Sequence, residues 1–210
     1  MNDITAANFG LLIAFLLPGF VTLWGIGEFS PTIHSWFTGS PEQSPSVGGF
    51  LYVTLGAVAS GLFVSTVRWL LIDRIHHKSG IVEPQWDFAA LNQNLATFEI
   101  LVASHYRFYQ AYANMAVAVV LAFIAATITR PELRTNLAGY IAGLIVVESV
   151  LWLGARDTLQ KYYRRAEALM VGNKEGSPVR TLPQTDRRPV GKPTPTSPGK
   201  IRLKIEGPFR

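Results

Sequence analysis

The 210-residue sequence contains no cysteine. Disulfide bonds, thiolate metal sites and cysteine nucleophiles are therefore excluded. The chain also lacks the glycine-rich phosphate-binding patterns, the metalloprotease helix motif and the elbow motif of serine hydrolases. Its long apolar segments hold neither paired aspartates nor a serine–histidine pair, which intramembrane proteolysis would need. We therefore expect no enzyme activity and no cofactor.

Histidine is scarce, with four residues in the chain. His76 and His77 are adjacent, but neighbouring residues point apart on a helix. Without cysteine, the histidines do not form a metal site of the usual composition. We therefore expect no bound metal ion.

Basic residues are missing from one region and concentrated in another. The segment 28–46 has no Lys or Arg, whereas 13 of the 19 Lys and Arg residues lie from Arg156 onward. A formal charge of +5 is compatible with nucleic-acid binding. A cytoplasmic tail facing anionic lipid headgroups explains the same charge with fewer assumptions, so we expect no nucleic-acid partner.

Four apolar segments are long enough to cross the hydrocarbon core of a membrane, which takes roughly 20 helical residues. They cover residues 9–27, 47–72, 108–129 and 135–155. Their apolar residues are continuous rather than alternating, which favours helices over barrel strands. The sequence therefore predicts an all-α integral membrane protein built as a four-transmembrane-helix bundle. No Lys or Arg precedes the first segment, and it is too long for a cleaved signal peptide, so we expect it to remain as the first span.

The distribution of Lys and Arg predicts the orientation, because cytoplasmic loops are enriched in these residues. The segment 28–46 is then outside, and the segment 73–107 and the tail are inside. With four spans, both termini lie in the cytoplasm. We expect a multi-pass protein of the plasma membrane, which in a bacterium is the inner membrane. Arg130 and Arg134 disagree, because this orientation places their short loop outside.

Three segments are expected on the cytoplasmic side. Residues 87–107 are predicted to be helical with Asp87 as N-cap, and this helix either lies on the membrane surface or extends the third span. Residues 156–171 are predicted to form a basic amphipathic helix that ends at Gly172. Residues 172–210 form a basic, proline-rich tail that cannot bury enough apolar surface to fold and should be disordered. Residues 201–206 alternate apolar and charged side chains, which suits strand addition to a protein partner.

Glu148 is the only ionisable residue that lies well inside a span predicted from the sequence. Such groups are costly in a bilayer and usually face a partner or a water-filled cavity. Arg68, toward the inner end of its own span, is the expected partner. An ion pair that locks the bundle is the favoured interpretation, and a proton or cation site is the alternative.

Small residues at four-residue spacing let helix backbones approach closely. The favoured interpretation is packing within one bundle, and a contact between copies in a homo-oligomer is the alternative. On the fourth span, Gly143 lies roughly 140° from Glu148 around the helix, so this span should be central or at a subunit interface. The small-residue rows consist of Ala57, Gly61 and Ser65 in the second span, Ala118, Ala122 and Ala126 in the third, and Gly139 and Gly143 in the fourth.

Two further features concern the ends of spans. Pro18 and Gly19 predict a kink in the first span. His105, Tyr106, Arg107 and Tyr109 lie where the third span enters the membrane and suit a collar that anchors it at the lipid headgroups. A pocket for a headgroup or another ligand is the alternative.

Together these features favour a non-enzymatic, multi-pass membrane subunit. It would assemble through its small-residue helix faces and anchor or scaffold a cytoplasmic partner. An oligomeric small channel or transporter with Glu148 in its pathway is the first alternative. A membrane enzyme acting on a lipid substrate is the second, although no acid–base pair for it is visible in the sequence.

Overall fold

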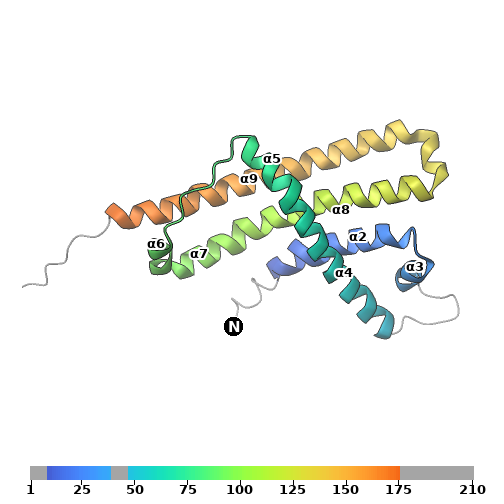
Figure 1. Ribbon diagram of the computed structural model, residues 1–210, viewed down its shortest axis with the longest axis horizontal. Coiled ribbons are helices and arrows are strands. Elements are labelled where there is room, and N and C mark those ends of the chain that lie inside the picture. Colours follow the sequence, from blue (N-terminus) through green and yellow to red (C-terminus); the bar gives the residue numbers. More distant parts are fainter. Residues whose placement is uncertain (1–8, 39–46, 176–210) are drawn as a thin grey trace, which may run out of the picture. The chain divides into compact units, whose positions relative to one another are not determined.

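The computed structural model describes residues 9–38 and 47–175, and within these ranges it contains helices and short connections but no strand. Four helices are long and apolar enough to cross a membrane: Phe9–Gly27, Val47–Lys78, Leu95–Thr129 and Pro131–Val171. Figure 1 shows their order along the chain. The prediction of an all-α chain with four helices long and apolar enough to span a membrane is confirmed for the described residues. Residues 176–210 of the predicted tail, which include residues 201–206, lie outside the described residues.

The first span comprises a π-helical segment, η1 (Leu12–Leu16), and α2 (Leu17–Gly27). Pro18 stands at the second position of α2, and the π-helical segment ends two residues before it. After a short turn, α3 (Pro31–Thr38) follows, which the sequence did not predict. Its Trp36 packs with Leu23 of α2 and Val53 of the second span.

The second span is one continuous helix made of α4 (Val47–Arg68), the π-helical η2 (Trp69–Asp73) and α5 (Arg74–Lys78). It is longer than the predicted segment 47–72, because the polar residues from Asp73 to Lys78 continue the helix. Gly80 then adopts a φ of +89°, a conformation that glycine accepts without strain, and the chain turns away.

The third span continues a helix that begins before the apolar segment. Asp87 caps α6 (Phe88–Gln93), and its side chain accepts a hydrogen bond from the backbone N–H of Ala90 at 3.1 Å. The helix is interrupted at Asn94. A single 35-residue helix then follows, made of α7 (Leu95–Leu101), the π-helical η3 (Val102–Tyr106) and α8 (Arg107–Thr129). The sequence left open whether residues 87–107 lie on the membrane surface or extend the third span. In the structure, the third span is extended and begins at Leu95.

The fourth span and the predicted amphipathic helix are also continuous. After the 3₁₀ segment η4 (Pro131–Asn136), α9 runs over 39 residues, Leu137–Glu175. The predicted stop at Gly172 is wrong, because α9 passes through it. A single glycine inside a helix costs only about 1 kcal/mol relative to alanine, and no proline follows closely enough to end the helix.

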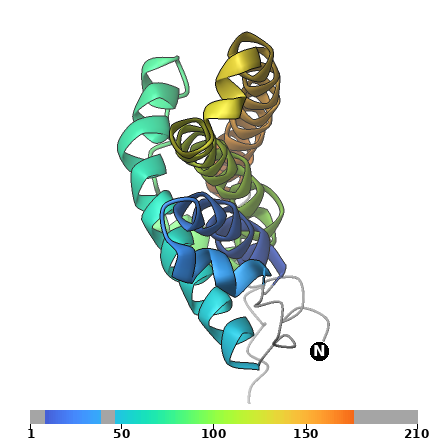
Figure 2. The ribbon, with the colours of Figure 1, turned by 90° about the vertical axis from the view of Figure 1, so that its right-hand side faces the viewer.

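The spans pack around α2, which contacts both α4 and α8, while α9 lies along α8. Figure 1 shows α4 crossing α2 while α8 and α9 run side by side, and Figure 2 shows the same arrangement from the end of the hairpin formed by α8 and α9. We call the end of the spans next to Gly27 and Thr129 the α3 end. The opposite end, next to Lys78 and Leu95, is called the α6 end.

Candidate functional site

A buried ionic cluster lies at the α6 end, where the second, third and fourth spans meet. Nη1 of Arg68 donates to both carboxylate oxygens of Asp73, at 2.9 and 3.2 Å. The hydroxyl of Tyr109 on α8 donates to Oδ1 of the same carboxylate at 2.5 Å. Cζ of Arg68 lies 5.3 Å from the centroid of the Tyr109 ring, so the guanidinium also rests on that ring. The three side chains therefore tie the second span to the third.

The π-helical segment η2 explains why Arg68 reaches Asp73. On a regular α-helix, residues five positions apart point about 140° away from each other. A π-helical turn instead brings residue i and residue i+5 to the same side. η2 covers Trp69–Asp73 and so aligns Asp73 with Arg68. Such turns occur frequently at functional sites.

His76 extends the cluster toward α9. Its ring is fully buried and stacks on Trp152, with ring centroids 4.2 Å apart, and it meets Tyr109 edge-on at 5.9 Å. Neither ring nitrogen of His76 has a hydrogen-bond partner among the described residues, and neither does Nε of Arg68. Buried polar groups are normally hydrogen-bonded, so three such nitrogens in one cluster distinguish it from ordinary helix packing.

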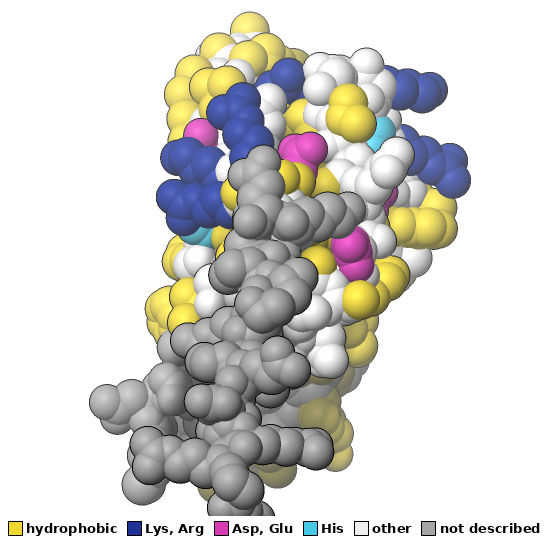
Figure 3. Space-filling model, turned by 90° about the vertical axis from the view of Figure 1, so that its left-hand side faces the viewer, with side chains coloured by type: hydrophobic (Ala, Val, Ile, Leu, Met, Phe, Trp, Pro, Cys, Tyr) yellow, Lys and Arg dark blue, Asp and Glu magenta, His cyan; other side chains and the backbone are white. Residues whose placement is uncertain are grey.

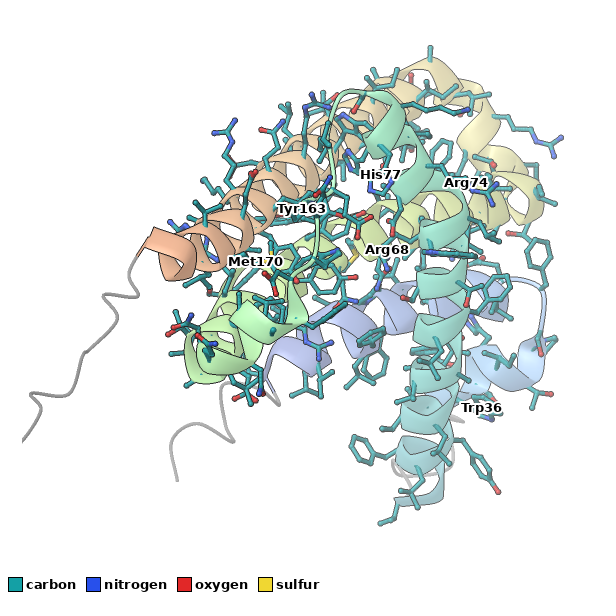
Figure 4. All side chains as sticks on the ribbon, turned by 60° about the vertical axis from the view of Figure 1, so that its left-hand side comes forward. Trp36, Arg68, Arg74, His77, Tyr163 and Met170 are labelled. Atoms are coloured by element: carbon teal, nitrogen blue, oxygen red, sulfur yellow. The ribbon has the colours of Figure 1, made fainter. Side chains whose placement is uncertain are left out.

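A polar pocket of about 290 Å³ opens beside this cluster. Nε2 of His77 lies 3.4 Å from the hydroxyl of Tyr163, so the pocket is bounded by α5 and α9. Figure 4 shows His77 and Tyr163 near one another, with Arg68 on α4. The pocket wall combines two carboxylates, two basic residues and four aromatic rings, and consists of Trp69, Asp73, Arg74, His77, Glu83, Tyr106, Tyr109, Leu159 and Tyr163.

The prediction that Glu148 and Arg68 form an ion pair is wrong. Arg68 pairs with Asp73 on its own helix, and Oε1 of Glu148 is buried without a hydrogen-bond partner within residues 9–38 and 47–175. Regular α-helical spacing would turn Asp73 away from Arg68, so the spacing alone offers no reason to pair them. No sequence signal marks the π-helical turn that reverses this.

The predicted collar is only partly at the surface. Tyr109 is 1% exposed and belongs to the buried cluster, so its assignment as a headgroup anchor is wrong. Tyr106 packs on Tyr109 and Tyr162. Nδ1 of His105 lies 2.8 Å from the hydroxyl of Ser104, and Arg107 donates to Gln110 at 3.2 Å. Tyr109 is buried because the third span is covered here by both the second and the fourth.

The small-residue rows differ in what they contact. A Cβ added to Gly19 would lie 1.8 Å from the carbonyl oxygen of Ala57 and 2.9 Å from the nitrogen of Gly61, so α2 and α4 touch through their backbones. Gly25 meets Ala122 of α8 in the same way. Ala118 and Ala126 are also buried, and Ser65 is half-buried.

The row on α9 has no comparable contact within the part of the chain that the structure describes. A Cβ added to Gly143 would have no heavy atom of another element within 4 Å, and one added to Gly139 would meet the side chain of Asn136 in the adjoining segment. Both glycines are exposed.

A second ion pair closes the α3 end. The guanidinium of Arg130 donates through Nε to Oε2 of Glu28 at 2.9 Å and through Nη2 to Oε1. Arg130 also lies over the ring of Trp24, 5.6 Å from its centroid. These hydrogen bonds lower the pKa of Glu28 and raise the pKa of Arg130. The positive charge of Arg130, which disagreed with the predicted orientation, is therefore balanced by Glu28.

No known protein family matches the chain, and no curated protein or solved structure shows a significant similarity to it. In the described ranges of the chain, no group of three or more histidines and carboxylates is placed to hold a metal ion. The site's function must therefore be inferred from its own geometry.

Proposed function

We propose that the protein is a non-enzymatic, multi-pass membrane subunit that assembles with further copies of itself and holds a cytoplasmic protein partner. The observation that carries this proposal is the exposed apolar surface of α9. In an apolar 18-residue window of the fourth span no residue is buried, whereas 22–39% of the residues are buried in the corresponding windows of the other three spans. The apolar part of α9 therefore has the fewest buried residues among the apolar parts of the four spans.

The glycines of α9 support a helix rather than lipid as the occupant of this face. Helices associate in lipid through close backbone packing at small residues. Gly19 and Gly61 make such a contact between α2 and α4. Gly143 offers the same kind of surface, but the described part of its own chain places nothing within 4 Å of an added Cβ. A helix of a second copy would supply the missing contact.

Disulfide crosslinking tests the assembly directly, because the chain has no cysteine of its own. Gly143→Cys should form a disulfide-linked dimer in native membranes, since a disulfide needs Cα atoms within about 7 Å. Ile145→Cys is the matched control, because Ile145 is at the same depth and about 200° away around the helix. Equal crosslinking at both positions, or none at either, would contradict assembly through this face.

The α6 end supports the proposed contact with a soluble partner. An open apolar groove of about 390 Å³ lies over α6, α7 and the second half of α9, lined by Trp86, Phe88, Leu91, Asn92, Leu95, Phe98 and Tyr162. Phe88 is 76% exposed. A protein that co-purifies with the wild type and with Val82→Asp, but not with Phe88→Asp, would support this assignment. Loss with both variants, or with neither, would oppose it.

A channel or transporter is the second candidate, and the observation that favours it is Glu148. Oε1 of Glu148 is buried within the membrane-spanning part of α9 and has no partner among the residues that the structure describes. Intramembrane carboxylates often mark ion or proton paths. Purified protein in liposomes should then conduct protons or cations, and Glu148→Gln should abolish the flux while leaving the crosslinked dimer intact. The absence of flux in the wild type would exclude this candidate.

A further inference from the structure

The polar pocket at the α6 end lies at the boundary between the apolar and polar surfaces of the second span. Trp69 on its rim is 60% exposed, and the neighbouring Leu71 is also exposed. Arg74 and His77, which follow within about two turns of the helix, also line the pocket. Tryptophan favours the headgroup level of a bilayer. The pocket therefore lies where an exposed apolar stretch of the second span gives way to charged residues, which suits the headgroup level of a bilayer.

The pocket wall is suited to a cation. Two carboxylates, Asp73 and Glu83, line it together with the rings of three tyrosines, Tyr106, Tyr109 and Tyr163. Aromatic ring faces attract ammonium and guanidinium groups. Tyr109 already receives one cation in this way, the guanidinium of Arg68. A cation–π contact is therefore already present at the pocket wall.

Both carboxylates retain the capacity to accept a further hydrogen bond. Oδ2 of Asp73 accepts a bond from Arg68 at 3.2 Å, and Oε1 of Glu83 accepts one from the indole N–H of Trp86 at 2.6 Å. An ionised carboxylate offers about four acceptor positions. An ammonium group, with up to three donors, would use the remaining ones.

We propose that this pocket binds the ammonium group of an amine-bearing phospholipid headgroup. Asp73 and Glu83 receive the ammonium, the tyrosine rings enclose it, and Arg74 at the rim pairs with the lipid phosphate. Basic side chains are plentiful at this end: Lys161, Arg164 and Arg165 are exposed in the second half of α9, and Figure 3 shows Lys and Arg side chains gathered over the same end. This site is independent of assembly through α9.

Lipid retention by the purified full-length protein tests the proposal. The protein is equilibrated with equal amounts of phosphatidylethanolamine and phosphatidylglycerol, and the bound lipids are counted by native mass spectrometry. The wild type should retain the ethanolamine lipid preferentially. Glu83→Gln should lower this preference about tenfold, because it removes one charge-assisted hydrogen bond, while its amide oxygen still accepts from Trp86. Glu99→Gln, which alters an exposed carboxylate on α7, is the matched control and should retain the preference.

A second pair of variants examines the tyrosine rings. Tyr163→Phe keeps the ring and should keep the preference, whereas Tyr163→Leu should lose it. Equal retention of both lipids by the wild type, a preference for the anionic lipid, or an unchanged preference in Glu83→Gln would overturn the proposal. Binding of soluble phosphoethanolamine without enrichment of the lipid would overturn the membrane as the source of the ammonium group.

Discussion

Pro18 and Asn114 show how single residues connect spans that are distant in sequence. Proline has no N–H, so the carbonyl of Ala14, four residues earlier, loses its helical donor. Nδ2 of Asn114 on α8 donates to this carbonyl at 2.6 Å, and both Asn114 and Ala14 are fully buried. The defect in the first span is thereby repaired by the third span, and it fixes how the two helices align.

Replacing Asn114 should therefore be costly in a way that depends on Pro18. We expect Asn114→Leu to lower the free energy of unfolding by about 1–3 kcal/mol, because it leaves a buried carbonyl without a donor. Pro18→Ala restores the backbone N–H, so the same substitution should cost less in that background. Unfolding by denaturing detergent, followed by circular dichroism, measures the four proteins of this cycle.

Thr54→Val is the control for this cycle, because the hydroxyl of Thr54 is exposed and bonds within its own helix. It should change the free energy of unfolding by less than about 0.5 kcal/mol. An equal cost of Asn114→Leu with and without Pro18 would show that the asparagine does not act through the proline.

At the scale of elements, the position of α2 depends on two close contacts on different sides. Gly19 lies against the backbone of α4, and Gly25 lies against Ala122 of α8. Neither contact leaves room for a side chain. The sequence predicted close packing for Ala57, Gly61 and Ala122 from their spacing, but the glycines of α2 that meet them lie outside the predicted small-residue rows. Spacing within a helix identifies a smooth face, yet it does not identify the partner.

Gly19→Ala should separate α2 from α4. The added methyl group would lie 1.8 Å from the carbonyl oxygen of Ala57, which is backbone and cannot rotate away. We expect a loss of about 1–3 kcal/mol or more in the free energy of unfolding, the range for overpacked cores. Gly143→Ala is the matched control, because its surroundings within the described chain are open, and it should leave monomer stability unchanged or raise it by up to about 1 kcal/mol through helix propensity. Equal effects of the two substitutions on the monomer would contradict the backbone contact.

The ion pair at the α3 end predicts a pH-dependent stability. Glu28 has a side chain that is 6% exposed, and Arg130 lowers the pKa of this carboxyl below the ordinary value of 4.5. A carboxyl with a lowered pKa in the folded state stabilises the fold at pH values above 4.5. This contribution is lost as the pH falls through the folded-state pKa. The thermal midpoint in detergent should therefore drop below pH 4.5.

Glu28→Gln should remove most of this drop while lowering the midpoint at neutral pH. Glu132→Gln is the control, since Glu132 is exposed in the neighbouring segment η4. Identical pH profiles for Glu28→Gln and the wild type would show that another group is responsible.

At the scale of the whole molecule, the sequence predicted the four spans but not the polar site between them. The spans follow from long apolar runs, which local composition reveals directly. The cluster of Arg68, Asp73, His76 and Tyr109 instead depends on the π-helical turn at η2 and on the packing of Trp152 over His76. Both depend on tertiary contacts between the second, third and fourth spans. Composition could indicate that Arg68 needs a partner, but it could not select Asp73 over Glu148.

The orientation in which the α6 end faces the cytoplasm stays a prediction, and the charges at the two ends of the spans make it testable. At the α3 end, Glu28 balances Arg130, which leaves little net positive charge there, whereas exposed basic residues gather at the α6 end. Positively charged loops stay on the cytoplasmic side. In intact cells, a membrane-impermeant thiol reagent should therefore label Ser35→Cys on α3 but not Val82→Cys beyond α5. Permeabilised cells should show labelling of both, which controls for reactivity. Labelling of Val82→Cys alone in intact cells would reverse the orientation, and with it the side on which a soluble partner and the amine-bearing lipid must be sought.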